Sequence, residues 1–242
     1  MGEVWRCGPF VVKCHHAPPA GLYEAEAKGL ASLARSGGKT PHVHHVDHDG
    51  LVLEYLEPGP TDGPDLANQL SCIHSQRRAQ YGWAEPVFIG RLPLPRDQRA
   101  DDWQLFWKSQ RIDPLLALTT RPLGALKHRI ISLLESYSPP TEGPCLLHGD
   151  LWSGNVVMSK RGASLIDPSV WCGERGVDLA MMRLFGGFPQ SFWSSYEERL
   201  PIPREVEEAI PYYQLYYILV HVHFFGVGYC REVSRVLEQY GH

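Results

Sequence analysis

The sequence predicts an α+β protein of two lobes, in which a small β-rich lobe precedes a larger, mostly helical one. Short apolar runs separated by turn residues fill the first 57 positions, together with one helical pattern. Residues 58–242 contain mainly longer segments with apolar residues at helical spacing, arranged around a short pair of strands. A stretch rich in proline and glycine, 57–64, separates the two parts. We therefore expect one domain over residues 1–57 and a second over residues 58–242.

The N-terminal lobe should contain three strands and one helix. Residues 4–6 and 10–13 are predicted as strands joined by a turn at Gly8-Pro9, and residues 51–56 as a third strand. Between them, residues 22–33 carry apolar side chains at intervals close to 3.6 residues. This spacing predicts a helix that follows two prolines, packs one face on the sheet and ends near Gly37.

A cluster of histidines lies between this helix and the last strand of the lobe. His42, His44, His45 and His48 stand there with Asp47. The segment is predicted as an exposed loop. Without a helix or paired strands to hold the ligands in place, solvent-exposed histidines are a better interpretation than a zinc or nickel site.

The C-terminal lobe should be built from helices. Asp65 is expected to cap the first of them, and Pro114 and Pro211 should bend or break the two longest. The expected helices cover residues 65–74, 101–118, 122–137, 177–184, 189–199 and 203–239.

A loop and a hairpin in the middle of the chain carry the residues that point to chemistry. Cys145–Leu147 is predicted as a buried strand that leads into the loop His148–Asn155. Residues 156–158 and 163–166 should then form a hairpin around a turn at 160–162, which would return the following residue, Asp167, to a position beside the loop.

The loop has the spacing of a phosphoryl-transfer enzyme. His148, Asp150 and Asn155 match the pattern H-x-D-x-x-x-x-N of protein kinases, and Asp167 stands where the metal-binding aspartate would follow. Such enzymes need a carboxylate to accept the proton of the attacking hydroxyl, for which Asp150 is the candidate. They also need hard oxygen ligands for Mg²⁺, which the Asn155 amide and the Asp167 carboxylate would supply.

The small lobe should grip the nucleotide. A kinase-like layout requires a lysine on the small sheet paired with a glutamate on its helix, and Lys13 and Glu26 occupy those places. Adenine normally contacts backbone at the connection between the lobes, where Glu54 and Leu56 lie. The order of elements and these residues together predict a bilobal protein-kinase-like fold that uses ATP and Mg²⁺.

Composition and charge exclude several other classes of protein. The formal net charge is −4 and no basic stripe is present, so nucleic acid is not an expected partner. The longest apolar stretch, 215–230, is interrupted by two histidines and is too short for a membrane span. No apolar leader begins the chain, and the six cysteines are scattered, which is typical of reduced thiols in the cytoplasm. We expect a monomer.

Several longer motifs resemble those of fructosamine-3-kinases, or ketosamine kinases, within the aminoglycoside-phosphotransferase-like group. The matching segments cover nearly the whole chain, and the narrowest of them are 147–155, 166–175, 177–180 and 184–188. The resemblance implies ATP-dependent phosphorylation of the C3 hydroxyl of a ketosamine, the product of a sugar and an amine. The resulting 3-phosphates of the family are unstable and release the amine, so the implied role is deglycation.

The resemblance also implies roles for individual residues. Asp150 would be the base, with Asn155 and Asp167 as Mg²⁺ ligands. Asp178 would brace the catalytic loop through its backbone, and His148 would do similar structural work. Three further residues are expected at the substrate: Trp152, which would stack on the sugar or amine or else anchor the loop in the core, and Trp171 and Glu174 in the same pocket.

In one respect the sequence departs from the resemblance. Members of the family carry a first strand and a Gly-rich loop before the segment that matches residues 2–13. The small lobe should therefore be a shortened one that lacks both.

Two other functions remain open from the sequence. The chain could phosphorylate another small hydroxylated substrate, such as an aminoglycoside, choline or a thiosugar. Aminoglycosides need an acidic surface, which five glutamates could supply: Glu197, Glu198, Glu205, Glu207 and Glu208. The chain could also be a nucleotide-binding pseudokinase, although Lys13, Asp150, Asn155 and Asp167 are all present.

Overall fold

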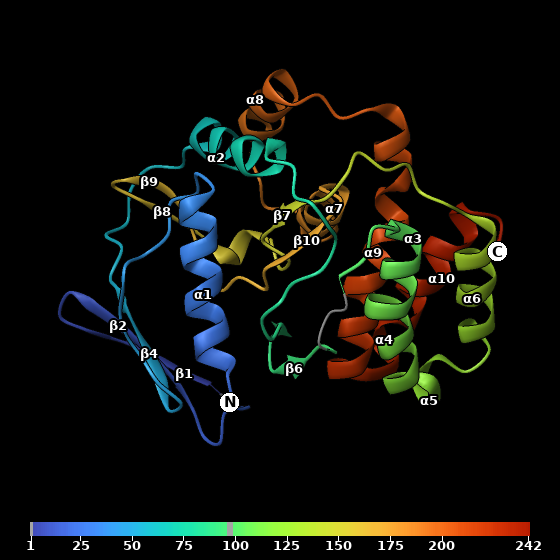
Figure 1. Cartoon of the computed structure of the whole chain (residues 1–242), viewed down its shortest axis with the longest axis horizontal. Coiled ribbons are helices and arrows are strands. Elements are labelled where there is room, and N and C mark those ends of the chain that lie inside the picture. The colour runs from blue at the N-terminus through green and yellow to red at the C-terminus, as the bar shows by residue number, and fades with distance from the viewer. Residues whose placement is uncertain (1, 96–98) are drawn as a thin grey trace.

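The small lobe is an antiparallel sheet covered by one helix. The computed structural model describes residues 2–95 and 99–242 (Figure 1). The sheet has four strands in the order β1-β2-β4-β3, and helix α1 packs against β3 and β4. The bounds of these elements are β1 Gly2–Cys7, β2 Phe10–His15, α1 Leu22–Arg35, β3 Val43–Val46 and β4 Gly50–Glu54.

This lobe has a hydrophobic core of its own. Tyr23 and Leu30 of α1 pack on Leu51 and Leu53 of β4, and all four side chains are buried. Leu51 and Leu53 share one face of β4 because side chains alternate along a strand. The helical spacing read from the sequence therefore places α1 on the sheet as expected.

The predicted loop at the histidine cluster is wrong, because part of it forms strand β3. Val43 and Val46 turn toward α1, whereas His44 and His45 are exposed. A β-bulge between Val43 and His45 shifts the register against β4. The extra residue places two histidines in succession on the outside, so the strand lacks the alternation by which strands are recognised.

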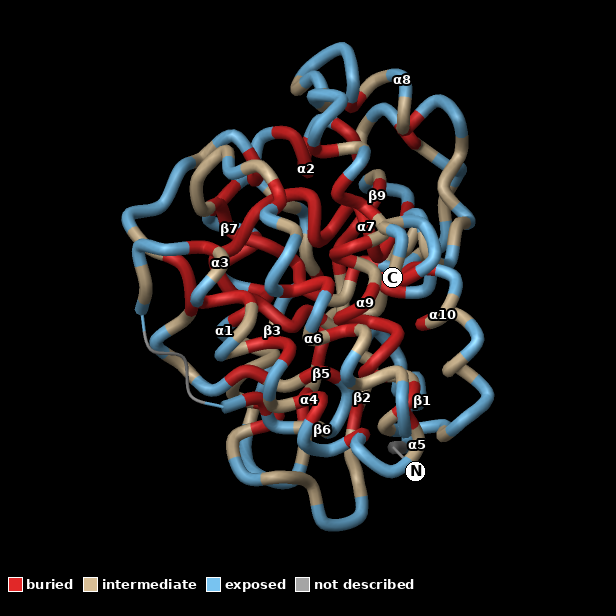
Figure 2. The backbone as a smooth tube through the Cα atoms, turned by 90° about the vertical axis from the view of Figure 1, so that its right-hand side faces the viewer, coloured by how far each residue is buried: buried red, intermediate tan, exposed pale blue. Residues whose placement is uncertain are grey.

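The large lobe surrounds a second and larger core. Figure 2 shows its buried residues gathered in the interior. Trp103, Trp107 and Trp171 lie at its centre with the tyrosines of α9. The helices are α2 Gly63–Ser75, α3 Trp103–Phe106, a π-helix at Trp107–Ile112, α4 Asp113–Leu118, α5 Thr120–Leu123, α6 Leu126–Ser136, α7 Gly176–Phe185, α8 Gln190–Arg199, α9 Arg204–Phe225 and α10 Cys230–Gln239. The short strands are β5 Phe88–Ile89, β6 Leu92–Pro93, β7 Cys145–Leu147, β8 Val156–Ser159, β9 Gly162–Leu165 and β10 Trp171–Gly173.

The helices differ from the prediction in three details. Helix α2 is capped by Asp62, whose Oδ1 accepts a hydrogen bond from the Asp65 N–H at 2.9 Å, because the helix begins earlier, with proline in its first turn. The long helix is not broken at Pro114 but widens into a π-helix just before it. Helix α9 continues through Pro211, since Ile210 before it and Tyr212 after it are both buried, and the helix ends at Phe225, before Gly226, where φ is +79°.

The connection between the lobes runs along strand β8. The Gly59 N–H donates to the Met158 carbonyl at 3.0 Å, and the Lys160 N–H donates to the Glu57 carbonyl at 3.0 Å. A side chain at residue 59 would meet the Ser159 backbone at 2.3 Å, so only glycine allows this approach. The predicted boundary between residues 57 and 58 falls within this segment.

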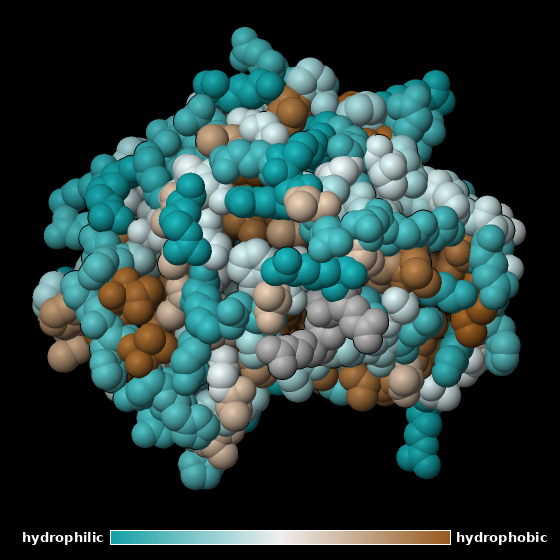
Figure 3. Space-filling model, in the orientation of Figure 1, coloured by the Kyte–Doolittle hydropathy of each residue, from teal (hydrophilic) through white to brown (hydrophobic). Residues whose placement is uncertain are grey.

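The face of the molecule drawn in Figure 3 is mostly polar. Figure 3 shows that polar residues cover most of this face and that hydrophobic ones form small separate groups. Within residues 2–95 and 99–242, no helix combines the length and the apolar character that crossing a bilayer requires.

Candidate active site

A cleft of about 420 Å³ brings together half of the residues that the sequence singled out. Lys13 comes from β2, Glu26 from α1, Asp150 and Asn155 from the loop after β7, and Asp167 from the segment after β9. Residues far apart in the chain thus face one cavity between the two lobes.

Lys13 joins the two lobes through ion pairs. Its Nζ lies 2.6 Å from Glu26 Oε1 and 2.7 Å from Asp167 Oδ1. Burial acts to lower the pKa of Lys13, but the attraction of the two carboxylates outweighs it and raises that pKa. The ammonium group is therefore held charged at the centre of the cleft, where it could bind phosphate.

Asp150 and Asn155 form a pair within the catalytic loop. The Asn155 Nδ2 donates to the Asp150 carbonyl at 2.8 Å and approaches Asp150 Oδ2 at 3.3 Å. The amide nitrogen is thereby committed to Asp150, which leaves the Asn155 amide oxygen as the group able to bind a cation. Burial, followed by the negative charge of Asp167, raises the pKa of Asp150 to about 7.

Asp167 adopts an uncommon backbone conformation. Its φ is +53°, in the left-handed region that Asp tolerates better than most residues. The preceding residue is fixed by the hairpin, because the Ile166 N–H donates to the Asn155 carbonyl at 3.0 Å. The left-handed turn that follows brings the Asp167 carboxylate back toward Lys13.

Asp178 fixes the backbone at the start of the catalytic loop, residues 148–155. Its two carboxylate oxygens accept the backbone N–H groups of His148, at 2.8 Å, and Gly149, at 2.9 Å. His148 Nδ1 accepts the Asp150 N–H at 3.3 Å, so Nε2 carries the proton that is donated to the Ile166 carbonyl at 2.9 Å. Burial lowers the pKa of His148, which favours this neutral form.

Gly149 is required by its backbone and its neighbours. Its φ is +79°, and a Cβ atom there would lie 1.9 Å from the Ser169 carbonyl oxygen. The Tyr217 hydroxyl on α9 donates to the Gly149 carbonyl at 3.1 Å. The loop is therefore fixed at the residue directly before Asp150.

Sequence reasoning missed two residues that support this loop. The His74 ring lies between Asp178, with Nε2 3.2 Å from Oδ2, and the Tyr196 hydroxyl, 2.8 Å from Nδ1. Tyr217 is the second. Both act across the fold, and the only local signal was an apolar helical pattern, which does not reveal a polar contact.

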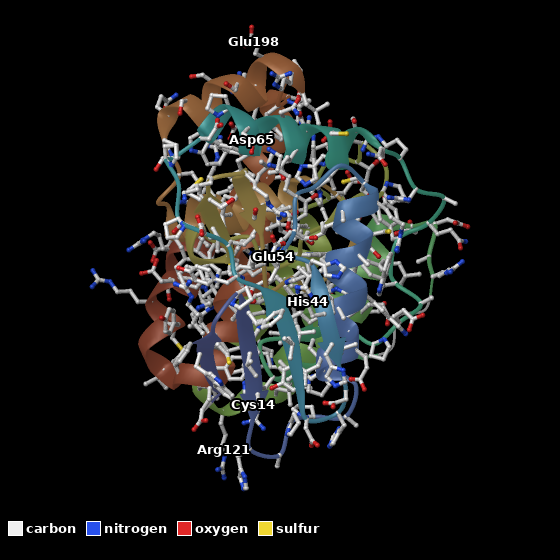
Figure 4. All side chains as sticks on the ribbon, turned by 90° about the vertical axis from the view of Figure 1, so that its left-hand side faces the viewer. Cys14, His44, Glu54, Asp65, Arg121 and Glu198 are labelled. Atoms are coloured by element: carbon white, nitrogen blue, oxygen red, sulfur yellow. The ribbon has the colours of Figure 1, made fainter. Side chains whose placement is uncertain are left out.

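Removing the Asp178 charge should destabilise the protein. Asp178→Asn replaces an acceptor oxygen by a donor, so a buried backbone N–H of the loop loses its partner. We expect a decrease of roughly 2–4 kcal/mol in the free energy of unfolding, measured by denaturant titration. Glu198→Gln, at the exposed position on α8 that Figure 4 marks, is the matched control and should change it little. An unchanged stability in Asp178→Asn would contradict the bracing role.

Two predicted substrate residues do not reach the cleft, so that part of the prediction is wrong. Trp171 is fully buried and lies parallel to Trp103, with the Arg111 guanidinium 4.2 Å from its ring centroid. Glu174 accepts hydrogen bonds from the Tyr81 hydroxyl at 2.5 Å and from the Glu142 N–H at 2.9 Å. Strand β10 pairs with β7 inside the core, which places both side chains away from solvent.

Trp152 lines the cleft, whereas the two residues expected at the lobe connection, Glu54 and Leu56, do not. The Trp152 side chain is 42% exposed, rests on Gly154 and lines the cleft, so it is not a core anchor. Figure 4 marks Glu54, on β4, whose carboxylate pairs with Arg161 at 3.0 Å. Leu56 lies just after this strand, and neither Glu54 nor Leu56 lines the cleft described above.

The arrangement is that of a small-molecule kinase with a protein-kinase-like fold, an ATP-dependent phosphotransferase. A family model for fructosamine kinase matches residues 6–241, and the chain belongs to this family. The sequence is 50% identical to a probable ketoamine kinase of Thermus thermophilus over 98% of this chain and 89% of that protein. It is 32% identical to a probable ketoamine kinase of Enterococcus faecium over 96% of this chain and 87% of that protein.

Solved structures agree with the fold. A candidate fructosamine-3-kinase of Thermobifida fusca superposes with a TM-score of 0.88 and 30% identity, covering 95% of this chain and 84% of that one. A choline kinase of Streptococcus pneumoniae, 16% identical, shares the fold alone, with a TM-score of 0.64 over 99% of this chain and 90% of that one. The predicted α+β, bilobal protein-kinase-like fold is confirmed.

Proposed function

We propose that the protein transfers the γ-phosphoryl group of ATP to the C3 hydroxyl of a ketosamine, such as a fructosamine or a ribulosamine. The observation that carries this proposal is the convergence of Lys13, Asp150, Asn155 and Asp167 on one cleft. Family membership and the names of the relatives supply the class of substrate. Phosphorylation at C3 would begin the release of the amine, a deglycation reaction.

The residues of the cleft suit magnesium as well as ATP. Asn155 and Asp167 offer an amide oxygen and a carboxylate, which are the hard donors that Mg²⁺ prefers. The bound ion would neutralise charge on the phosphates. Lys13, held by Glu26, would bind the α- and β-phosphates.

Asp150 would act on the acceptor. Its carboxylate accepts the proton of the C3 hydroxyl as phosphoryl transfer proceeds, while Asp178 and His148 keep the loop in place. Trp152 would stack on the sugar or its amine. The small lobe, residues 1–57, would hold the nucleotide, and adenine would contact backbone near Glu54 and Leu56. The Glu54 N–H already donates to the His42 carbonyl at 2.8 Å, so adenine would have to use other backbone groups of this segment.

An aminoglycoside is a poorer substrate for this cleft. Glu197 and Glu198 lie on α8, and Figure 4 shows Glu198 at the outer end of the molecule. Glu207 and Glu208 are paired with Arg183 and Arg204. The five glutamates that could have held several ammonium groups all lie within the described part of the chain, and none of them lines the cleft.

The raised pKa of Asp150 predicts a pH dependence. A base works only when it is deprotonated, and burial together with Asp167 raises the pKa of Asp150 to about 7. The value of kcat/KM for MgATP, which reports on groups of the free enzyme, should therefore fall about tenfold per unit as the pH drops below about 7. A flat profile down to about pH 5 would contradict the assignment.

A mass-spectrometric assay tests the function. The protein is incubated with MgATP and, separately, with a fructosamine, a ribulosamine and kanamycin. We expect one phosphate to be added to a ketosamine and none to kanamycin. Phosphorylated kanamycin with unmodified ketosamines would favour the aminoglycoside alternative, and no product with any acceptor would favour a pseudokinase.

A further inference from the structure

A second cavity, of about 280 Å³, opens next to the catalytic base. Gly90, Asp150 and Trp152 line both this cavity and the catalytic cleft, so the two are adjacent. Most of the remaining wall comes from helices α7 and α9. The apolar side chains that these two helices contribute are Met181, Phe185, Val220, Phe224 and Phe225.

The wall of this cavity exposes large hydrophobic side chains. Phe185 is 42% exposed, Phe224 43% and Phe225 67%, and the indole of Trp152 lies beside them. Aromatic side chains left in water contribute little to folding. A contiguous group of them next to a catalytic residue indicates a surface that binds something apolar.

The wall is held in position by contacts within the large lobe. The His221 ring packs between Phe185 and Phe225, with centroid distances of 4.9 and 5.5 Å. Its Nδ1 donates to the Tyr217 carbonyl at 2.7 Å, which fixes the ring on α9. Phe224 lies against Gly90 at the turn between β5 and β6, and so closes the cavity on the other side. The cavity is thus formed before a ligand arrives.

The covalent structure of a ketosamine indicates which part of the molecule would fit the second cavity. Its sugar carries the reacting hydroxyl at C3, and the substituted nitrogen is attached at C1, two carbons away. Once the C3 hydroxyl contacts Asp150, the group on the nitrogen must leave the cleft close to that residue. The side of the cleft that contains Lys13, Glu26 and Asp167 is charged and suits phosphates, whereas the side beyond Asp150 and Trp152 is apolar.

We propose that this second cavity binds the substituent on the amine, and that the enzyme selects ketosamines whose amine carries an aliphatic or aromatic group. The inference rests on the proposed function and deepens it by naming the class of amine. A third cavity, of about 330 Å³, lies beside the second: Phe185 and His221 line both, and the ion pair of Glu232 and Arg235 lies at the third.

The proposal is tested with two fructosamines that carry the same sugar, one made from methylamine and one from hexylamine. Selection is measured as the ratio of kcat/KM for the hexyl compound to kcat/KM for the methyl compound. We expect a ratio of about ten or more in the unaltered protein, because each additional methylene group bound in an apolar pocket strengthens the selection. In Phe185→Ala/Phe225→Ala the ratio should fall to about two or less.

Controls separate the proposal from loss of folding and from failure of the proposed function. Leu118→Ala removes a hydrophobic side chain that is 51% exposed on α4 and lies outside the cavity, and it should keep the original ratio. Thermal unfolding shows that each variant is folded. A ratio near one in the unaltered protein, or a ratio that survives the double substitution, overturns the inference while leaving ketosamine phosphorylation intact. Phosphorylation of neither compound overturns both.

Discussion

Asp150→Asn should reduce turnover by about 10²–10⁴-fold while ATP binding is retained. The amide has nearly the shape of the carboxylate but cannot take the proton of the acceptor hydroxyl. The loop should keep its conformation, because its backbone is held by Asp178 and the Asn155 Nδ2 donates chiefly to the Asp150 carbonyl. Turnover is measured with a ketosamine at saturating MgATP, and nucleotide binding is measured by calorimetry.

The control for this substitution is Asp49→Asn, which removes a carboxylate at an exposed turn between β3 and β4. It should leave both turnover and binding unchanged. If Asp150→Asn turned over ketosamine at the original rate, Asp150 could not be the base. If it lost nucleotide binding as well, the defect would lie in the shape of the cleft rather than in proton transfer.

Asp167→Ala should have a comparably large effect, but on the binding of nucleotide with metal. Substitution of a residue that hydrogen-bonds to a metal ligand typically weakens metal binding by about 10–100-fold. Removal of the ligand itself should therefore weaken the binding of Mg²⁺ by about 100-fold or more. The substitution also leaves Lys13 paired with Glu26 alone, since the contact of 2.7 Å between Lys13 Nζ and Asp167 Oδ1 is lost. ATP binding is titrated with and without Mg²⁺, and the strengthening by Mg²⁺ should disappear in the variant.

Two comparisons make this result specific. Lys13→Met should weaken ATP binding both with and without the metal, because it removes a positive charge and no ligand. Asp49→Ala should behave as the unaltered protein does. A Mg²⁺ titration that is the same in Asp167→Ala as in the original chain would show that Asp167 is not a metal ligand.

The parts of the site that could be predicted are those encoded over short distances. Asp150 and Asn155 lie within one loop, and a hairpin of a few residues returns Asp167 beside them. Lys13 and Glu26 could be paired because a strand followed by a helix leaves few arrangements. The structure places Lys13 Nζ within 2.7 Å of the carboxylates of both Glu26 and Asp167.

What could not be predicted depends on contacts across the fold. His74 meets Asp178 over a separation of 104 residues, and Tyr217 meets Gly149 over 68. Glu174 is a charged residue close in sequence to the site. It is nevertheless buried in the core, where it accepts hydrogen bonds from the Tyr81 hydroxyl and the Glu142 N–H. The sequence shows which side chains are polar, but not which distant residues contact them in the fold.

Local irregularities account for most of the remaining differences in the fold. The bulge in β3 hides the alternation that would have revealed a strand at Val43–Val46. Pro211 lacks an N–H donor and would end an isolated helix, but burial of the neighbouring tyrosines on α9 keeps the helix continuous. In the helix, tertiary packing outweighs the local signal, whereas in the strand the bulge removes that signal.

The most direct test of the site is a crystal structure with Mg²⁺, a non-hydrolysable ATP analogue and a ketosamine bound. We expect the Asn155 amide oxygen and an Asp167 carboxylate oxygen at about 2.0–2.1 Å from the metal. The C3 hydroxyl should lie within about 3.2 Å of the Asp150 carboxylate and face the γ-phosphate. A metal held by other residues, or a sugar whose C3 hydroxyl is remote from Asp150, would contradict the proposed mechanism.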